Sequence, residues 1–270
     1  MKKSTSKNIA SKVIDLKIYA LKNLKKSINK DFDKAVNTIV ECRSKIILCG
    51  VGKSGLIAAK IASTLSSVGS PAFSLSANDC LHGDLGSITK KDVLILISNS
   101  GKSEEIIPII KFANRNKIKL IGIVSKKKSF LYKASDIKIL LPEVKESGLG
   151  FVPTSSTSIQ LAVGDALAVA SLKKKQFSKY DFSRLHPGGS LGRQLKTVGD
   201  IMVSGKKIPF INEKKNMKEA LKIISQKKLG VIIAYNRKKI TTGIITDGNV
   251  RKLRQKNIDL QKTIIKNVMT

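Results

Sequence analysis

Tryptophan is absent from this 270-residue chain, and aromatic side chains make up only 4% of it. A protein that stacks nucleic-acid bases on aromatic rings is therefore disfavoured. Arginine is also scarce, with seven residues among the 51 basic ones, against 19 acidic residues. Arginine binds a phosphate group with two hydrogen bonds at once, which lysine cannot do. The formal charge of +32, carried mostly by lysine, therefore predicts a solvated surface rather than a specific nucleic-acid partner.

Cysteines and long apolar runs are few as well. Cys42, Cys49 and Cys80 lack metal-ligand spacing, and their odd number argues against a disulfide framework and for a reducing compartment. The longest apolar run, residues 161–172, is interrupted by Asp165 and is too short to span a bilayer. The basic start of the chain is not followed by the apolar stretch of a signal peptide. We expect a cytoplasmic protein without a membrane partner, and its 41% apolar residues permit a core.

Short apolar runs alternate with helical patterns through the first two thirds of the chain. Continuous runs of this kind are typical of strands buried on both faces of a parallel sheet. They cover residues 45–51, 92–98, 119–124 and 137–141, and a weaker run covers residues 71–75. Helical patterns cover residues 56–65, 104–114, 130–135 and 157–174, and spacings near 3.6 predict one or two amphipathic helices before residue 43. This order predicts right-handed βαβ units, and therefore an α/β fold.

A different pattern begins near residue 195. Its predicted elements are a helix at 217–226, strands at 231–235 and 240–246, and a helix at 249–255. Asp200-Ile201-Met202 opens this unit, and the similar Asn267-Val268-Met269 at the end of the chain resembles the start of a second copy. We therefore expect N-terminal helices at 1–42, a first domain at 43–195, and a small α+β unit at 196–270 whose partner copy is missing.

A glycine-rich turn follows the first predicted strand. Gly50-Val51-Gly52-Lys53-Ser54-Gly55 matches the GxGxxG fingerprint of dinucleotide sites. The second strand ends at Leu75-Ser76 without the acidic residue that would hold a ribose, and Ile47 stands where a P-loop needs glycine. What remains is a helix N-terminus suited to an anionic substrate, with Lys53 projecting into it. The alternative is a tight strand–helix turn with a solvated lysine.

Two hydroxyl-rich loops, which begin at Ser98 and Thr154, precede other predicted helices, and each could be a simple helix cap. Together with the glycine turn they are predicted at the carboxyl edge of one parallel sheet, which indicates a site for a phosphorylated small molecule. We also include Gly69 and Ser70, which precede the second predicted strand. The candidate substrate-binding residues from these segments are Gly52, Ser54, Gly69, Ser70, Ser98, Asn99, Ser100, Thr154, Ser155 and Ser156.

The only two histidines of the chain stand in glycine-rich loops rather than on apolar faces. His82 lies in Leu81-His82-Gly83-Asp84-Leu85-Gly86, and His186 opens His186-Pro187-Gly188-Gly189-Ser190-Leu191-Gly192. A loop histidine can transfer protons near neutral pH. Glu146 follows the fifth predicted strand and is either a functional or a plain surface carboxylate.

Six motifs in this order, GVGKSG, LHGDLG, SNSGKSEE, PTSST, GDALAVA and HPGGSLGR, resemble the sugar isomerase (SIS) domain of D-arabinose-5-phosphate isomerases. The segment after Val198 resembles the first of the two CBS motifs of those enzymes. The resemblance covers about residues 10 to 270. It implies a three-layer αβα domain with a five-stranded parallel sheet, a homotetramer, no organic cofactor, and interconversion of D-ribulose 5-phosphate and D-arabinose 5-phosphate. That reaction leads to Kdo, a sugar of lipopolysaccharide, or serves a catabolic or regulatory use of arabinose 5-phosphate, because paralogues of both kinds share these motifs.

The resemblance also implies a set of functional residues. The catalytic positions of the family fall on Lys53, Glu105, Glu146 and His186, and His82 is expected to bind substrate. Many relatives carry another histidine at the position of Ser76, where metal inhibition has been placed, so no metal site is expected here. Lys102 stands where relatives often have Glu. The missing second CBS motif puts CBS-based regulation in doubt.

An aldose–ketose isomerase needs a base, a carrier for the oxygen-bound protons, and a donor for the oxyanion of the cis-enediolate. Glu146 or His186 can be the base, Lys53 can steady the oxyanion, and Glu105 can order Lys53 or carry a proton. The sequence does not assign base and acid among them. The alternative from another class is a sugar-phosphate-sensing module without turnover, because SIS domains also occur in transcriptional regulators.

Overall fold

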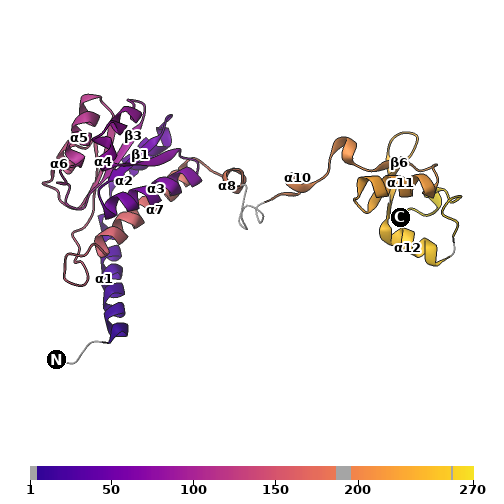
Figure 1. Cartoon of the computed structure of the whole chain (residues 1–270), viewed down its shortest axis with the longest axis horizontal. Coiled ribbons are helices and arrows are strands. Elements are labelled where there is room, and N and C mark those ends of the chain that lie inside the picture. The colour runs from indigo at the N-terminus through magenta and orange to yellow at the C-terminus, as the bar shows by residue number, and fades with distance from the viewer. Residues whose placement is uncertain (1–4, 187–195, 257) are drawn as a thin grey trace. The chain divides into compact units, whose positions relative to one another are not determined.

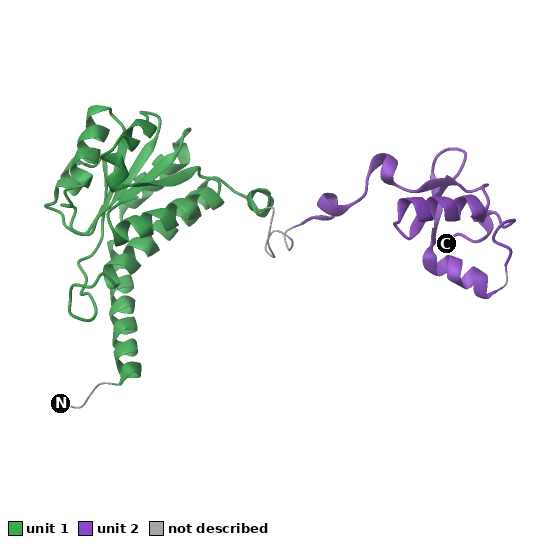
Figure 2. Ribbon diagram, in the orientation of Figure 1, with its two compact units in different colours: residues 1–195 green, residues 196–270 purple. Residues whose placement is uncertain are grey.

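The computed structural model describes residues 5–186, 196–256 and 258–270. Residues 187–193 of the HPGGSLGR motif therefore lie outside the described part of the chain. The chain forms two compact units, Met1–Leu195 and Lys196–Thr270, which are coloured separately in Figure 2. Each unit is described by itself.

The first unit is built on a parallel sheet of five strands in the order β2-β1-β3-β4-β5. The strands are β1 (Ile46–Gly50), β2 (Ala72–Ser76), β3 (Val93–Ile97), β4 (Lys119–Val124) and β5 (Ile137–Leu140). β1 and β3 are buried along their whole length, as their uninterrupted apolar sequences predict. The five-stranded parallel sheet expected from the sequence is confirmed.

Helices cover both faces of this sheet, so the unit has three layers (Figure 1). One face packs against α1 (Ser6–Ser27), α2 (Lys30–Glu41), α3 (Lys53–Ser67) and α7 (Ser155–Lys174). The other face packs against α4 (Ala77–Cys80), α5 (Ile106–Arg115) and α6 (Phe130–Ala134), with a 3₁₀ turn at Asp84–Ser87. A short helix, α8 (Lys179–Leu185), follows α7.

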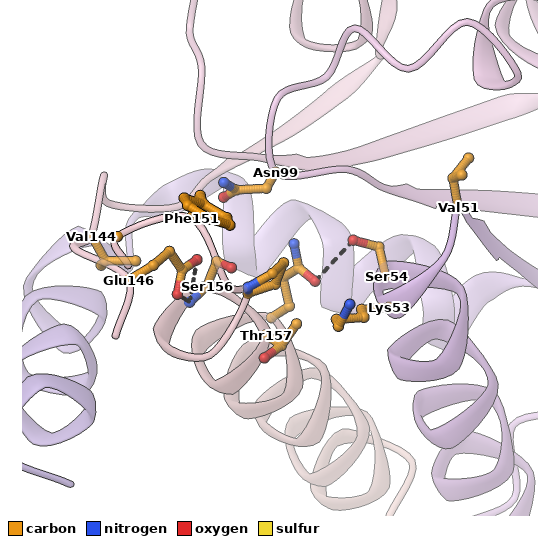
Figure 3. Close-up of a pocket in the computed structure, with 12 residues that line it drawn as sticks. Val51, Lys53, Ser54, Asn99, Val144, Glu146, Phe151, Ser156 and Thr157 are labelled. Atoms are coloured by element: carbon orange, nitrogen blue, oxygen red, sulfur yellow. Dashed lines mark hydrogen bonds between the residues drawn. The ribbon is translucent and has the colours of Figure 1, made fainter. Parts of the chain in front are cut away.

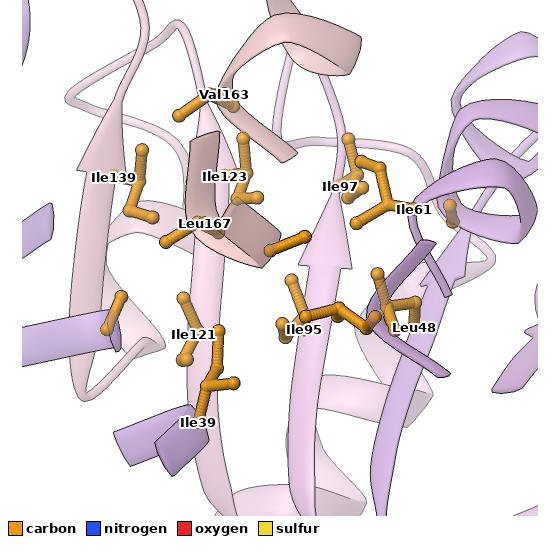
Figure 4. Packing of buried hydrophobic residues seen from close by; sticks show 14 of the residues in the cluster. Ile39, Leu48, Ile61, Ile95, Ile97, Ile121, Ile123, Ile139, Val163 and Leu167 are labelled. Atoms are coloured by element: carbon orange, nitrogen blue, oxygen red, sulfur yellow. The ribbon is translucent and has the colours of Figure 1, made fainter. Parts of the chain in front are cut away.

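Alternate residues of each strand supply the two cores. In β1, Ile46 and Leu48 belong to the core beneath α3 and α7, whereas Ile47 and Cys49 belong to the opposite core. Figure 4 shows the first of these cores. Helices α3 and α7 approach closely there, because a Cβ on Gly164 would collide with the Ile61 side chain. That close contact sets the positions of α3 and α7, whose N-termini reach the edge of the sheet described below.

The second unit contains a small mixed sheet. Strand β6 (Phe210–Asn212) runs parallel to β7 (Val231–Tyr235), which pairs antiparallel with β8 (Thr241–Thr246). Its helices are α10 (Val198–Ile201), α11 (Met217–Lys227) and α12 (Asp247–Gln255), with 3₁₀ turns at Gly205–Lys207 and Ile265–Asn267. The sequence predicted the two longer strands and the two longer helices but missed β6, whose three residues are too few to show a pattern.

The last residues of the chain complete this second unit. Ile265 is fully buried in its core, and Thr270 exchanges two backbone hydrogen bonds of 2.9 Å with Ile244 of β8. The segment that resembles the start of a second copy is therefore packed into the core of the first one. Across the described residues, no helix combines the length and the apolar character needed to cross a membrane.

Candidate active site

A pocket of about 450 Å³ opens at the carboxyl edge of the large sheet (Figure 3). The loops after β1, β3 and β5 meet there because the carboxyl ends of parallel strands share one edge. The volume lies in the range of small-molecule sites. The lining residues are Val51, Lys53, Ser54, Asn99, Val144, Glu146, Gly150, Phe151, Pro153, Ser156, Thr157 and Gln160.

The glycine-rich turn after β1 brings Lys53 and Ser54 to this pocket. Gly52 has a φ of +56°, a conformation that favours glycine. A Cβ on Gly50 would lie 2.8 Å from the Ser54 carbonyl carbon, so this glycine lets the strand and helix α3 touch. The GxGxxG pattern is thus explained by backbone geometry. Lys53 is the first residue of α3, and its side chain is exposed at the pocket wall.

Glu146 is held by the N-terminus of α7 (Figure 3). Its Oε2 accepts hydrogen bonds from the Thr154 and Ser155 backbone N–H groups, at 2.8 and 2.7 Å, and from the Thr154 hydroxyl at 3.0 Å. The backbone N–H of Ser156 reaches the same carboxylate at 3.3 Å. A carboxylate in this place satisfies free helix N–H groups and sits at the positive end of the helix dipole.

These contacts keep Glu146 ionised. Burial raises the pKa of the Glu146 carboxyl, but hydrogen bonds from Ser156, Thr154 and Ser155 outweigh burial, so its pKa lies below the usual value. At neutral pH the pocket therefore holds a negatively charged carboxylate.

The PTSST loop holds the Glu146 loop in place. Thr154 bridges two parts of the Glu146 loop, because its hydroxyl donates to Glu146 and accepts from the Ser147 N–H at 3.0 Å. That Thr154, Ser155 and Ser156 bind a phosphate stays a prediction. Ser155 is fully buried and does not line the pocket, whereas Ser156 does.

The SNSGKSEE loop after β3 contributes one residue to the pocket. Asn99 lines it, and the Asn99 side-chain oxygen accepts a 2.7 Å hydrogen bond from the Ser125 hydroxyl. The hydroxyl of Ser98 turns into its own loop and accepts from the Gly101 N–H at 3.0 Å. Ser100 lines a neighbouring cavity with a lysine-rich wall.

Two further candidates stand at the same edge of the sheet but outside the pocket wall. Glu105 is half-buried at the N-cap position of α5 and makes no capping bond there. His82 follows α4 and is exposed. Both lie in loops that follow strands of the sheet.

Gly69, Ser70 and His186 lie elsewhere. Gly69 and Ser70 precede β2, so they belong to the amino edge of the sheet, where Lys175 at the end of α7 bonds to both. Gly69 and Ser70 therefore do not line the pocket of their own chain, and their binding of substrate stays a prediction. His186 caps α8, which begins close to Lys175, and its Nδ1 donates to the Phe182 carbonyl oxygen at 2.8 Å.

Gln160 is one of the pocket residues that the sequence did not single out. It belongs to α7, is 1% exposed, and its Oε1 accepts a 3.2 Å hydrogen bond from the Ser54 hydroxyl. An amide inside an otherwise apolar helical stretch was the available signal. The aromatic Phe151 and the neighbouring Pro153 also line the pocket and belong to the loop between Glu146 and α7.

The arrangement suits proton abstraction next to a carbonyl group. Glu146 supplies an ionised base, and the ammonium of Lys53 and the amide of Asn99 supply donors on other walls of the same pocket. Within the described ranges, no three His, Cys, Asp or Glu side chains gather as a metal ion would require.

Comparison with known proteins agrees with these features. Residues 39–170 match the SIS domain family, and residues 198–256 match the CBS domain family. Arabinose 5-phosphate isomerase KdsD of Yersinia pestis is 41% identical over 260 residues, which cover 96% of this chain and 79% of that protein. The protein of the same name from Escherichia coli K12 is 38% identical over the same shares.

A solved structure is also similar to the first unit. The Escherichia coli CFT073 protein c3406, solved in complex with arabinose 5-phosphate, has a TM-score of 0.66 and 33% sequence identity. The match covers 69% of this chain and 100% of that one.

Proposed function

Since the chain belongs to the arabinose 5-phosphate isomerase family with SIS and CBS domains, we propose that it interconverts D-ribulose 5-phosphate and D-arabinose 5-phosphate. The observation that carries this proposal is the meeting of Lys53 and Glu146 in one pocket at the carboxyl edge of the sheet. Both residues were expected to be catalytic from the resemblance of the sequence. The pocket volume of about 450 Å³ accommodates a pentose phosphate.

In the proposed mechanism Glu146 is the base. It takes the proton from C1 of ribulose 5-phosphate, the electron pair moves toward the C2 oxygen, and a cis-enediolate forms. The proton then returns to C2, while a proton moves from O1 to O2, which gives the aldehyde of arabinose 5-phosphate. Glu146 is favoured over His186 because Glu146 lines the pocket and is ionised at neutral pH.

The remaining expected residues support this chemistry. Lys53 steadies the negative charge of the enediolate, and Glu105 orders Lys53 or carries the proton between the oxygens. His82 helps open the furanose ring or binds a hydroxyl group. We propose that Ser54, Asn99 and Ser100 anchor the substrate, whose phosphate orients the reacting carbons.

His186 requires a second subunit in this mechanism. It lies with α8 near the amino edge of its own sheet, so it can reach a catalytic pocket only in a neighbouring copy. Helix α1 exposes Ile14 and Ile18, at 56% and 45%, which suits burial between subunits. We therefore propose that subunits share active sites, within the homotetramer that the resemblance of the sequence implies.

The reaction is redox-neutral, so we propose that it uses no organic cofactor. We further propose that the enzyme acts in the cytoplasm and feeds Kdo and lipopolysaccharide synthesis, as the resemblance of the sequence implies. The alternative of a sensing module without turnover would tolerate loss of the acid–base groups. The presence of Lys53 and Glu146 in one pocket favours turnover instead.

The test is incubation of the purified protein with D-ribulose 5-phosphate and detection of D-arabinose 5-phosphate. Lys53→Ala is the comparison variant that should be inactive, because it removes the ammonium from an exposed position without disturbing the core. Conversion by the unchanged protein and its loss in the variant are expected. Binding of the sugar phosphate without conversion would overturn the proposal and support a sensing module.

A further inference from the structure

The amide of Gln160 carries an unused hydrogen-bond donor into the pocket wall. Its side chain is 1% exposed, and among the described residues its Nε2 has no hydrogen-bond partner. Buried polar groups are nearly always paired, because an unpaired donor costs free energy in the folded protein. An orphaned donor next to a cavity therefore points to a partner that arrives with the ligand.

Other buried groups of this kind do not face the pocket. The hydroxyls of Ser147, Ser155 and Ser171 also lack partners in the described part of the chain. None of these three residues lines the pocket, whereas Gln160 does. Among these four residues with unpaired buried groups in the described chain, Gln160 is therefore the one that lines the pocket.

The amide of Gln160 contacts Ser54 of α3. The Ser54 hydroxyl donates to Oε1 of Gln160 at 3.2 Å, and the dashed line from Ser54 in Figure 3 marks this bond. With Oε1 held by α3, Nε2 is the atom left for a substrate. Ser156 lies one turn before Gln160 on the same face of α7 and lines the same pocket.

This position lies between the two groups that act on the substrate. Gln160 contacts the residue that follows Lys53, and it stands one turn along α7 from Ser156, whose N–H binds Glu146. Gln160 thus lines the same pocket as Lys53 and Glu146 and is linked to the segments that carry both.

We propose that Nε2 of Gln160 donates a hydrogen bond to the substrate oxygen on which negative charge develops in the enediolate. The inference rests on the proposed isomerase function and adds a catalytic residue to it. A neutral amide suits this role because it stabilises the oxyanion without giving up its proton. Nε2 is buried in the ligand-free structure, so the pocket wall must shift as the substrate binds to bring the substrate oxygen to it.

The test compares Gln160→Met with the unchanged protein. Methionine has a similar length but no donor, so kcat should fall about 10²-fold, the scale for losing one oxyanion donor, with a smaller change in KM. The ligand-free variant should melt at the same temperature or higher, because the unpaired buried donor has been removed. Ser54 is only half-buried, so its hydroxyl can turn to water in the variant.

Ser171→Ala is the matched control. It removes another unpaired buried polar atom from the same helix, away from the pocket. It should preserve or raise the melting temperature and leave kcat unchanged. Gln160→Glu keeps the shape of the side chain but replaces the donor with a carboxylate, so its kcat should fall at least as far as that of Gln160→Met.

The outcomes separate the inference from the proposed function. An active unchanged protein together with a fully active Gln160→Met variant would overturn only the role of Gln160. A variant that loses activity and also melts well below the unchanged protein would show a structural role and overturn the inference as well. Failure of the unchanged protein to convert ribulose 5-phosphate would refute the proposed function itself.

Discussion

Replacing Glu146 by Gln separates two roles of this side chain, the proposed base and the cap of α7. The carboxylate accepts from the N–H groups of Thr154, Ser155 and Ser156 and from the Thr154 hydroxyl. Glutamine can still place an oxygen near these donors, but it carries no charge and accepts no proton. The substitution should therefore remove the chemistry and only weaken the cap.

The two effects differ in size. Loss of a positioned acid–base group lowers kcat by about 10²- to 10⁴-fold. Loss of a capping group costs about 1 kcal/mol of unfolding free energy, and loss of the charge at a helix N-terminus costs about 0.3–1 kcal/mol. Because glutamine keeps part of the cap, a loss of about 1 kcal/mol in unfolding free energy is expected for Glu146→Gln.

The stability difference should depend on pH in one direction. The pKa of Glu146 is lowered in the folded protein, so its ionised form stabilises the fold at pH values above the ordinary pKa of glutamate. That contribution is lost as the pH falls through the lower, folded-state pKa. Glu146→Gln and the unchanged protein should therefore differ in stability at pH 7 and converge in acid, and the acid limb of kcat/KM should lie below the ordinary glutamate pKa.

Urea unfolding and initial rates with ribulose 5-phosphate measure the two effects separately. Glu143→Gln is the matched control, since Glu143 lies three residues earlier, pairs with Lys126 and is 67% exposed. It should change unfolding free energy by less than about 1 kcal/mol and leave kcat unaltered. Full kcat in Glu146→Gln would refute its role as base, and a stability difference that grows in acid would refute the role of its charge in capping.

Three further expectations concern other parts of the chain. If His186 completes the pocket of a neighbouring subunit, mixing His186→Gln with Lys53→Ala subunits should restore part of the activity; mixed oligomers that stay inactive would contradict shared sites. Deletion of residues 199–270 should leave turnover in place, since the pocket belongs wholly to the first unit; loss of activity in a folded truncated protein would count against this division. Burial raises the pKa of Asp92, but hydrogen bonds led by that from Ser44 lower it to about 2. Asp92→Asn should therefore cost about 2 kcal/mol of unfolding free energy at pH 7, and this loss should vanish as the pH falls from about 4 to 2; equal losses at all pH values would show that the charge is not responsible.

Much of the fold follows from local sequence. The five runs became the five parallel strands, and β1 and β3, which are covered on both faces, are buried at every position. The glycine turn after β1 was likewise predictable, since positive φ and close backbone approach leave few other residues possible. The candidates Lys53, Ser54, Asn99 and Glu146 were also identified, because they follow strands whose carboxyl ends share one edge.

Other features depend on contacts between distant segments, which no local pattern encodes. The short strand β6 forms only by pairing with β7. The partner of the α7 N-terminus is Glu146, eight residues before Thr154, because the intervening loop folds back.

Gln160 is the clearest case of a feature that depends on contacts between distant segments. Its sequence context gives only an amide within an apolar helix, and the rotation of α7 against α3 decides which way that amide faces. This rotation is set by the contact of Gly164 with Ile61, more than 100 residues apart along the chain. The sequence by itself thus determined which segments form the sheet and which loops meet at its edge. Only tertiary packing decided which side chains of those segments face the pocket, because that depends on how separate helices pack against one another.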